Sequence, residues 1–70
     1  MITQTAADLR DHLELLQQER TLALTTSLAD DPAYMADLDE EITATRHAYV
    51  GSAVVELARL RARLHGELQG

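Results

Sequence analysis

Several residue types that small proteins use to reinforce their folds are missing from this chain. Its 70 residues contain no cysteine, lysine, tryptophan or phenylalanine. They contain only one proline and two tyrosines. Without cysteine, neither a disulfide nor a cysteine-ligated zinc ion can hold the fold together. Because a core of this size rarely supplies more than about 3–5 kcal/mol, the fold needs a further source of stability. A histidine or carboxylate metal site, a partner chain and close helix packing remain as sources.

Basic residues and long apolar runs are also scarce. Six arginines stand against twelve acidic residues, which gives a formal net charge of −6. Nucleic-acid-binding proteins normally carry a basic face. No apolar run approaches the roughly 20 residues that a membrane-spanning helix needs, and no signal peptide is recognisable. We therefore expect neither nucleic-acid nor membrane binding, and a cytoplasmic location is the default expectation.

The residues that are present in quantity favour helices. Leu, Ala, Glu, Gln and Arg are good helix formers, and only five apolar residues are β-branched. Asp31 and Pro32 are typical of an N-cap and a first helical position, and the residue before proline avoids the helical region. Thr5 followed by Asp8 resembles a capping box. These signals predict an all-α single domain over residues 1–70, with a helix at about 5–28, a turn at 29–31 and a helix at about 32–65.

Apolar residues recur at helical spacing in both predicted helices. The short connection between them predicts an antiparallel two-helix hairpin with these stripes facing each other. Arg20 lies in the middle of the first stripe, where we expect it to pair with Glu41 or Glu40. The first stripe consists of Leu9, Leu13, Leu16, Ala23, Leu24 and Ser27, and the second of Met35, Leu38, Ile42, Thr45, Tyr49, Ala53, Leu57, Leu60 and Leu64.

A second set of positions on the longer helix holds mostly small residues at heptad spacing. A solvated alanine-rich face would explain such a set, because alanine is the best helix former. The glycine in this set, however, costs about 1 kcal/mol inside a helix, and close approach of another backbone would explain it. Alternatively, this glycine marks a break that gives three short helices. The small-residue stripe consists of Ala44, Ala48, Gly51, Val55, Ala58 and Ala62.

The predicted helices differ in length, which leaves apolar residues uncovered. At 1.5 Å per residue the first is about 36 Å long and the second about 50 Å. The first helix therefore cannot cover the segment from Val55 to Leu68, and its own Leu15 and Leu22 lie off its main stripe. Homo-oligomerisation, most simply a dimeric four-helix bundle, would bury these surfaces. The expected interface residues are Leu15, Leu22, the small-residue stripe, Leu57, Leu60 and Leu64.

Charge is divided unevenly along the chain. Residues 1–45 hold ten acids and two arginines, a net charge of −8, whereas residues 46–70 hold two acids and four arginines, a net charge of +2. An antiparallel hairpin therefore has an acidic turn end and a more basic open end. An antiparallel dimer could set each basic end against the acidic end of the other copy, mainly as a device for steering and register.

Metal-binding and catalytic patterns are weak. The three histidines, His12, His47 and His65, do not form the Glu-x-x-His pattern of di-iron bundles, and Asp8 with His12 is explained as a helical pair. We expect no metal and no cofactor. Small helical enzymes can build sites from arginine and carboxylate groups inside a dimer. The candidate ligand or ion-pair residues for such a site are Arg20, Glu41, Arg46 and Tyr49.

The function favoured by these patterns is non-enzymatic. The sequence predicts a small helical interaction protein, such as an adaptor, inhibitor or regulatory subunit, that acts through protein–protein contacts as a homo-oligomer, with a dimer favoured. One alternative is a ligand-binding or enzymatic helical bundle with an Arg/carboxylate site at the oligomer interface. Another is a component of a larger assembly, in which the exposed faces meet a different chain.

Overall fold

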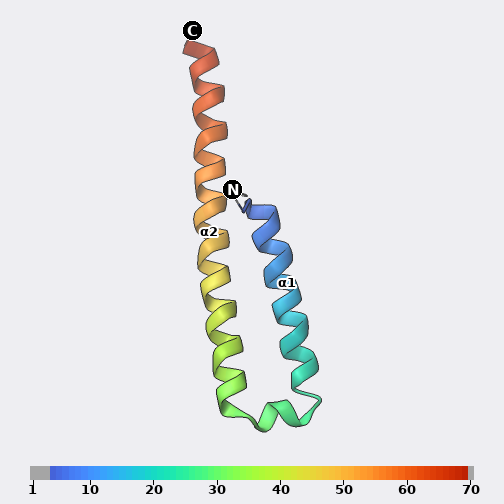
Figure 1. The fold of residues 1–70 in the computed structure, drawn as a ribbon. Coiled ribbons are helices and arrows are strands. Elements are labelled where there is room, and N and C mark those ends of the chain that lie inside the picture. Colours follow the sequence, from blue (N-terminus) through green and yellow to red (C-terminus); the bar gives the residue numbers. More distant parts are fainter. Residues whose placement is uncertain (1–3, 70) are drawn as a thin grey trace.

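The chain folds into two helices joined by a short 3₁₀ turn (Figure 1). The computed structural model describes the backbone of residues 4–69 and the side chains of residues 4–65. Helix α1 spans Ala6–Ala23, the 3₁₀ helix η1 spans Ser27–Asp30 and helix α2 spans Pro32–Gln69. The predictions of an all-α chain and of a two-helix hairpin are confirmed for this part of the chain.

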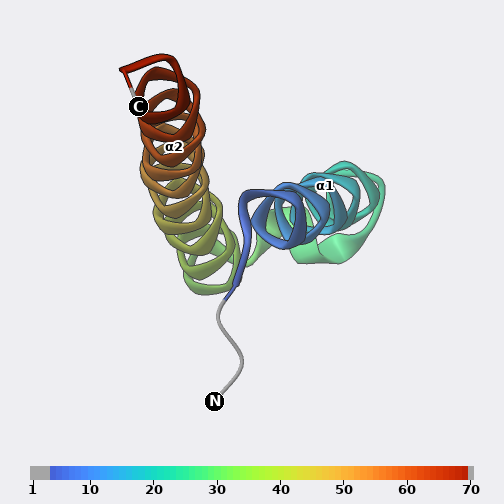
Figure 2. The same cartoon turned by 90° about the horizontal axis from the view of Figure 1, so that it is seen from above.

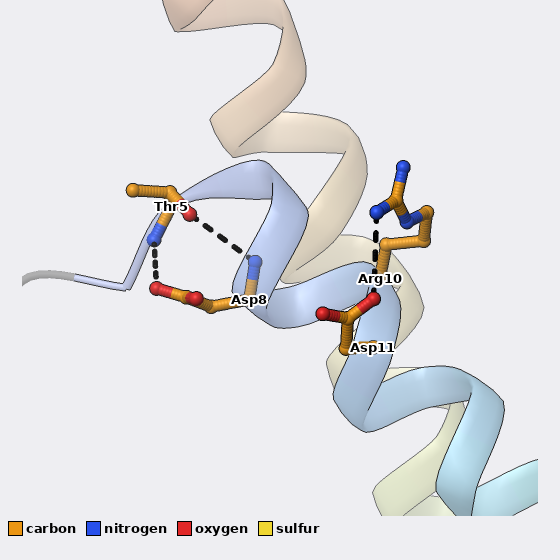
Figure 3. A network of polar contacts seen from close by, with 4 residues as sticks. All are labelled: Thr5, Asp8, Arg10 and Asp11. Atoms are coloured by element: carbon orange, nitrogen blue, oxygen red, sulfur yellow. Dashed lines mark hydrogen bonds and ion pairs between the residues drawn. The ribbon is translucent and has the colours of Figure 1, made fainter.

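Helix α1 begins at a complete capping box (Figure 3). The Thr5 hydroxyl accepts a hydrogen bond of 3.1 Å from the backbone N–H of Asp8, and the Thr5 N–H donates one of 3.2 Å to the Asp8 carboxylate. These two bonds satisfy N–H groups that have no partner inside the helix. One turn later, Arg10 and Asp11 form an exposed ion pair of 3.4 Å.

The end of α1 differs from the prediction, because the helix stops at Ala23 and not at Leu28. The hydroxyls of Thr25 and Thr26 donate to the carbonyls of Leu22 and Ala23 at 2.7 and 2.9 Å, and the Thr26 hydroxyl also accepts from the N–H of Leu28 at 3.1 Å. Such local bonds offer the backbone an alternative to the helix. The chain therefore turns through η1, which occupies part of the predicted helix.

Helix α2 has the predicted start, and it is continuous over its whole length. Pro32 is its first residue, and the Asp31 carboxylate accepts a hydrogen bond of 3.1 Å from the N–H of Tyr34. This arrangement is the predicted N-cap followed by proline at the first helical position. The helix runs through Gly51 without interruption to Gln69, so the alternative of a break at this glycine is wrong.

The core of the hairpin is small and lies where the two predicted stripes meet. Leu16 of α1 packs with Leu38 and Ile42 of α2, and Leu13 and Tyr34 close over this cluster. Among the described residues, only five hydrophobic side chains are buried, together with one polar residue. They are Leu9, Leu16, Ala23, Leu38, Ile42 and Thr45.

The hairpin is markedly asymmetric in length. It measures 61 × 21 × 16 Å, and α1 begins only about halfway along α2 (Figure 1). Seen from above, α1 lies against one side of α2 (Figure 2). The backbone N–H of Ala6 donates a hydrogen bond of 2.7 Å to the Glu56 carboxylate, which places the start of α1 beside this residue. The rest of α2, residues 57–69, extends past α1, and we call it the free end.

Candidate protein-interaction surface

The free end of α2 carries apolar side chains that the described part of the chain leaves exposed. Leu57, Leu60 and Leu64 are 61%, 46% and 54% exposed. They continue the stripe that packs against α1 further down the helix, but α1 starts too low to reach them. These three predicted interface residues are therefore accessible to a partner, whereas the side chain of Leu68 lies outside the described residues.

The small-residue stripe is also open to solvent in the single chain. All six of its residues are exposed. A Cβ atom built on Gly51 would meet no atom within 4 Å. Hence no close approach among the described residues requires glycine at position 51, and they give no explanation for its cost to the helix.

Helix α1 presents apolar residues on its outer side as well. Leu15 and Leu22 are 63% and 67% exposed. Together with Leu28 and Tyr34 they line an open hollow beside the turn. The two leucines predicted to need a partner from their sequence position are thus uncovered in the single chain.

Arg20 is held by a different carboxylate from the two that the sequence suggested. Its Nε donates a hydrogen bond of 2.7 Å to the Asp39 carboxylate, so the prediction of Glu41 or Glu40 as its partner is wrong. The hydrogen bond and the negative charge of Asp39 raise the pKa of the arginine. Both side chains are partly solvated, which limits the contribution of this pair to stability.

The other candidate ligand residues do not gather around Arg20. Glu41 lies 3.4 Å from Nε2 of His12. Arg46 is exposed and Tyr49 half-buried, and neither forms a side-chain hydrogen bond or ion pair with the residues described here. The four residues proposed as an Arg/carboxylate site are therefore not brought together within one chain.

Two polar contacts that position the hairpin were not foreseen from the sequence. The Tyr34 hydroxyl donates a hydrogen bond of 2.6 Å to the Glu19 carboxylate, which joins the two helices next to the turn. The Glu56 carboxylate accepts from the N–H of Ala6 and, at 3.1 Å, from the Ser52 hydroxyl. The second contact could have been found from the sequence, because Glu56 is an acid in the middle of the longer helix. In the hairpin it is level with the start of the shorter helix.

The described residues offer neither a cluster of metal ligands nor a membrane-spanning helix. They contain no group of three or more His, Cys, Asp or Glu side chains that could hold a metal ion. Within the same residues, neither helix has an apolar segment long enough to cross a bilayer.

Known proteins give no further guide to this surface. No protein-family model matches the chain, no curated protein matches it, and no solved structure matches its fold.

Proposed function

We propose that this protein is a non-enzymatic helical interaction protein that acts as a homo-oligomer, most simply a dimer. One observation carries the proposal: among the described residues, ten large hydrophobic side chains are exposed, whereas only five hydrophobic residues are buried. Exposed apolar patches of this kind mark interaction sites. Burying them would also supply the stability that a five-residue core lacks.

The second copy of this chain is the occupant best supported for these surfaces. A net charge of −8 over residues 1–45 and of +2 over residues 46–70 makes the chain complementary to itself when two copies run in opposite directions. Both helices carry exposed leucines, so each copy could cover apolar surface on the other. The same features support a regulatory or adaptor role, in which the assembled helices present their outer faces to a protein partner.

The Arg/carboxylate site is the weaker candidate. Arg20 is already bonded to Asp39, and Glu41 lies beside His12. A ligand would have to displace these partners, whereas the exposed leucines need no rearrangement to be covered. We therefore favour the interaction protein over the ligand-binding bundle.

Sedimentation equilibrium of the purified chain tests the proposal. We expect a dimer at micromolar concentration, and we expect the double variant Leu57→Gln/Leu64→Gln to shift it towards monomer. The matched control is Ala36→Gln/Thr43→Gln, which places two glutamines, again seven residues apart, at exposed positions of α2 outside the predicted interface. A wild-type chain that stays monomeric at high micromolar concentration would show that the homo-oligomer proposal is wrong.

A further inference from the structure

The free end of α2 belongs to a longer apolar face that begins beside α1. Five apolar residues follow one another at spacings of 3, 4, 3 and 4, which places them on one side of the helix. Four of them are 46–61% exposed, and Ala53 is half-buried. We call this set the leucine face, and it consists of Val50, Ala53, Leu57, Leu60 and Leu64.

The leucine face adjoins the side of α2 that packs on α1. Leu57 and Leu60 line a hollow together with Ala6, the first residue of α1. At about 100° per residue, the small-residue stripe lies on the other side of the helix, away from both. A helix that covers the leucine face therefore lies beside α1 and leaves the stripe in solvent.

The spacing of the leucine face is that of helices that pack side by side along their length. A second copy has the same face, and the uneven charge of the chain favours the antiparallel orientation. In one such register, Leu57 lies opposite Leu60 of the second copy, and Ala53 lies opposite Leu64. The two-fold axis makes each contact twice, so four layers of apolar residues form.

The position of α1 is compatible with this register. A two-fold axis perpendicular to α2 leaves both α1 helices on the same side of the pair, where they follow one another in line. Ala6 is level with Glu56, which is level with position 61 of the second copy. The two α1 helices therefore start five residues, or about 7.5 Å, apart along α2. Gln4 and Thr5 turn out of this gap, since they line a hollow with two residues of the small-residue stripe.

Registers one heptad away fit less well. If the second copy moved seven residues towards the turn, the starts of the two α1 helices would pass each other and collide. If it moved seven residues the other way, Leu57 would face Glu67, and only two apolar layers would remain. The spacing of the leucine face and the position of α1 thus agree on one register.

A charge contact fits the same register. Glu56 and Arg63 lie on the edge of the leucine face next to Ala6, and Arg63 forms no ion pair with the described residues. Arg63 of the second copy comes within two residues of the level of Glu56, about 3 Å along the axis. Ala6 and Ser52 both donate to Oε2 of Glu56, so its Oε1 can accept from this arginine.

From these observations we infer that two copies of this chain pair antiparallel through their leucine faces, with the two-fold axis midway between Ala58 and Arg59. The inference rests on the proposed homo-oligomer and adds its geometry. In this dimer the free end of each α2 packs against α2 of the other copy, and the other copy's α1 lies alongside it. Glu56 of each copy binds Arg63 of the other.

Cysteine cross-linking tests this pairing, because the chain has no cysteine of its own. The variant Ala53→Cys/Leu64→Cys carries two thiols eleven residues apart, about 16 Å along the helix, which is too far for a disulfide within one chain. We expect mild oxidation to join position 53 of one copy to position 64 of the other, twice per dimer. Digestion and mass spectrometry identify the linked positions. Links from 53 to 53 and from 64 to 64 would show a parallel dimer and overturn the pairing.

The matched control is Ala48→Cys/Ala58→Cys, which places two thiols ten residues apart in the small-residue stripe. These positions would face each other in an antiparallel pair formed through the stripe. We expect them to cross-link at least about tenfold more slowly than the first variant. Faster cross-linking of the control would mean that the copies pair through the stripe, so the inferred pairing would be wrong while the homo-oligomer stands.

A charge variant tests the same register without cysteine. Arg63→Glu places like charges beside Glu56 at both contacts, so we expect dimerisation at least about tenfold weaker than wild type in sedimentation. The matched control Arg59→Glu makes the same change one turn earlier, on the side away from the second α2, and should change the affinity by less than about threefold. Equal affinities for Arg63→Glu and wild type would overturn the pairing, and a wild-type monomer would overturn the homo-oligomer as well.

Discussion

The backbone N–H of Ala6 donates a hydrogen bond of 2.7 Å to the carboxylate of Glu56, fifty residues further along the chain. This bond satisfies one of the unpaired N–H groups at the start of α1 and places a negative charge at the positive end of the helix. The hydroxyl of Ser52 donates to the same carboxylate oxygen at 3.1 Å. Glu56 therefore fixes the level on α2 at which α1 begins, and with it the length of the free end.

Replacing Glu56 by glutamine should weaken the hairpin. The amide can still accept from Ala6 but carries no charge, so we expect the free energy of unfolding to fall by about 0.5–1 kcal/mol at low ionic strength. Urea unfolding followed by circular dichroism measures the change. The control is Glu40→Gln, an exposed acid on the same helix. Equal losses for both variants would contradict the role of Glu56 as a cap.

Substitutions of Gly51 should stabilise the single chain without changing the affinity of the dimer. A Cβ atom at this position meets no atom within 4 Å among the described residues, beyond the local backbone of α2 itself. We therefore expect Gly51→Ala and Gly51→Leu each to stabilise α2 by about 0.5–1 kcal/mol. Pairing through the leucine face leaves the small-residue stripe in solvent, so both variants should dimerise with wild-type affinity. Leucine at position 51 is too large for close approach of a second helix there, and a loss of affinity of at least about tenfold would place the stripe in the interface instead.

The control for this prediction is Thr43→Leu, which adds leucine at an exposed position of α2 outside the small-residue stripe. Sedimentation compares the three variants with wild type, and urea unfolding at high dilution reports on the single chain. Dimerisation of Gly51→Leu with wild-type affinity would show that position 51 faces solvent in the assembled protein.

The sequence identified the elements of the fold better than their ends. Asp31 and Pro32 located the start of α2 because capping chemistry is local and depends on few residues. The end of α1 was placed five residues too late, since the apolar spacing continues through Leu24 and Leu28. The hydroxyls of Thr25 and Thr26 bond to nearby backbone atoms and end the helix, and periodicity does not register such competition.

Which side chains are exposed was predicted better than which polar side chains contact one another. Helical periodicity correctly separated the buried Leu16 from the exposed Leu15, because it reports which side of a helix a residue occupies. It does not fix how far one helix is shifted along the other. The sequence therefore suggested the wrong partner for Arg20. The three consecutive acids Asp39, Glu40 and Glu41 differ by at most 3 Å along the helix axis, at about 1.5 Å per residue, so a small shift of one helix changes which of them is nearest.

Ionisation of Tyr34 should occur at higher pH than that of an ordinary tyrosine. The hydrogen bond to the Glu19 carboxylate, assisted by burial and by its negative charge, raises the pKa of the phenol above about 10. Because the folded-state pKa is the higher one, this contact stabilises the fold below about pH 10 and is lost as pH rises through the folded-state pKa. The free energy of unfolding should accordingly fall in that range.

The pKa is measured by the near-ultraviolet absorbance of tyrosinate in a Tyr49→Phe background, which leaves Tyr34 as the only phenol. Adding Glu19→Gln should lower the midpoint towards the ordinary value, because the negative charge is removed. An unchanged midpoint after that substitution would mean that the Tyr34 hydroxyl does not bond to Glu19 in solution.

Truncating one buried and one exposed leucine should give opposite results in stability and assembly. Leu16 is 6% exposed and packs with Leu38 and Ile42, so Leu16→Ala should cost about 2–5 kcal/mol. That is comparable to everything a core of this size supplies, and we expect the helical signal in circular dichroism to melt near room temperature.

Leu60 is 46% exposed, so Leu60→Ala should leave the helical signal of the dilute chain unchanged while weakening the dimer in sedimentation. If Leu60→Ala instead destabilised the dilute chain as strongly as Leu16→Ala, the free end would have to be covered within a single copy, for instance by α1 lying further along α2 than the Glu56 contact allows.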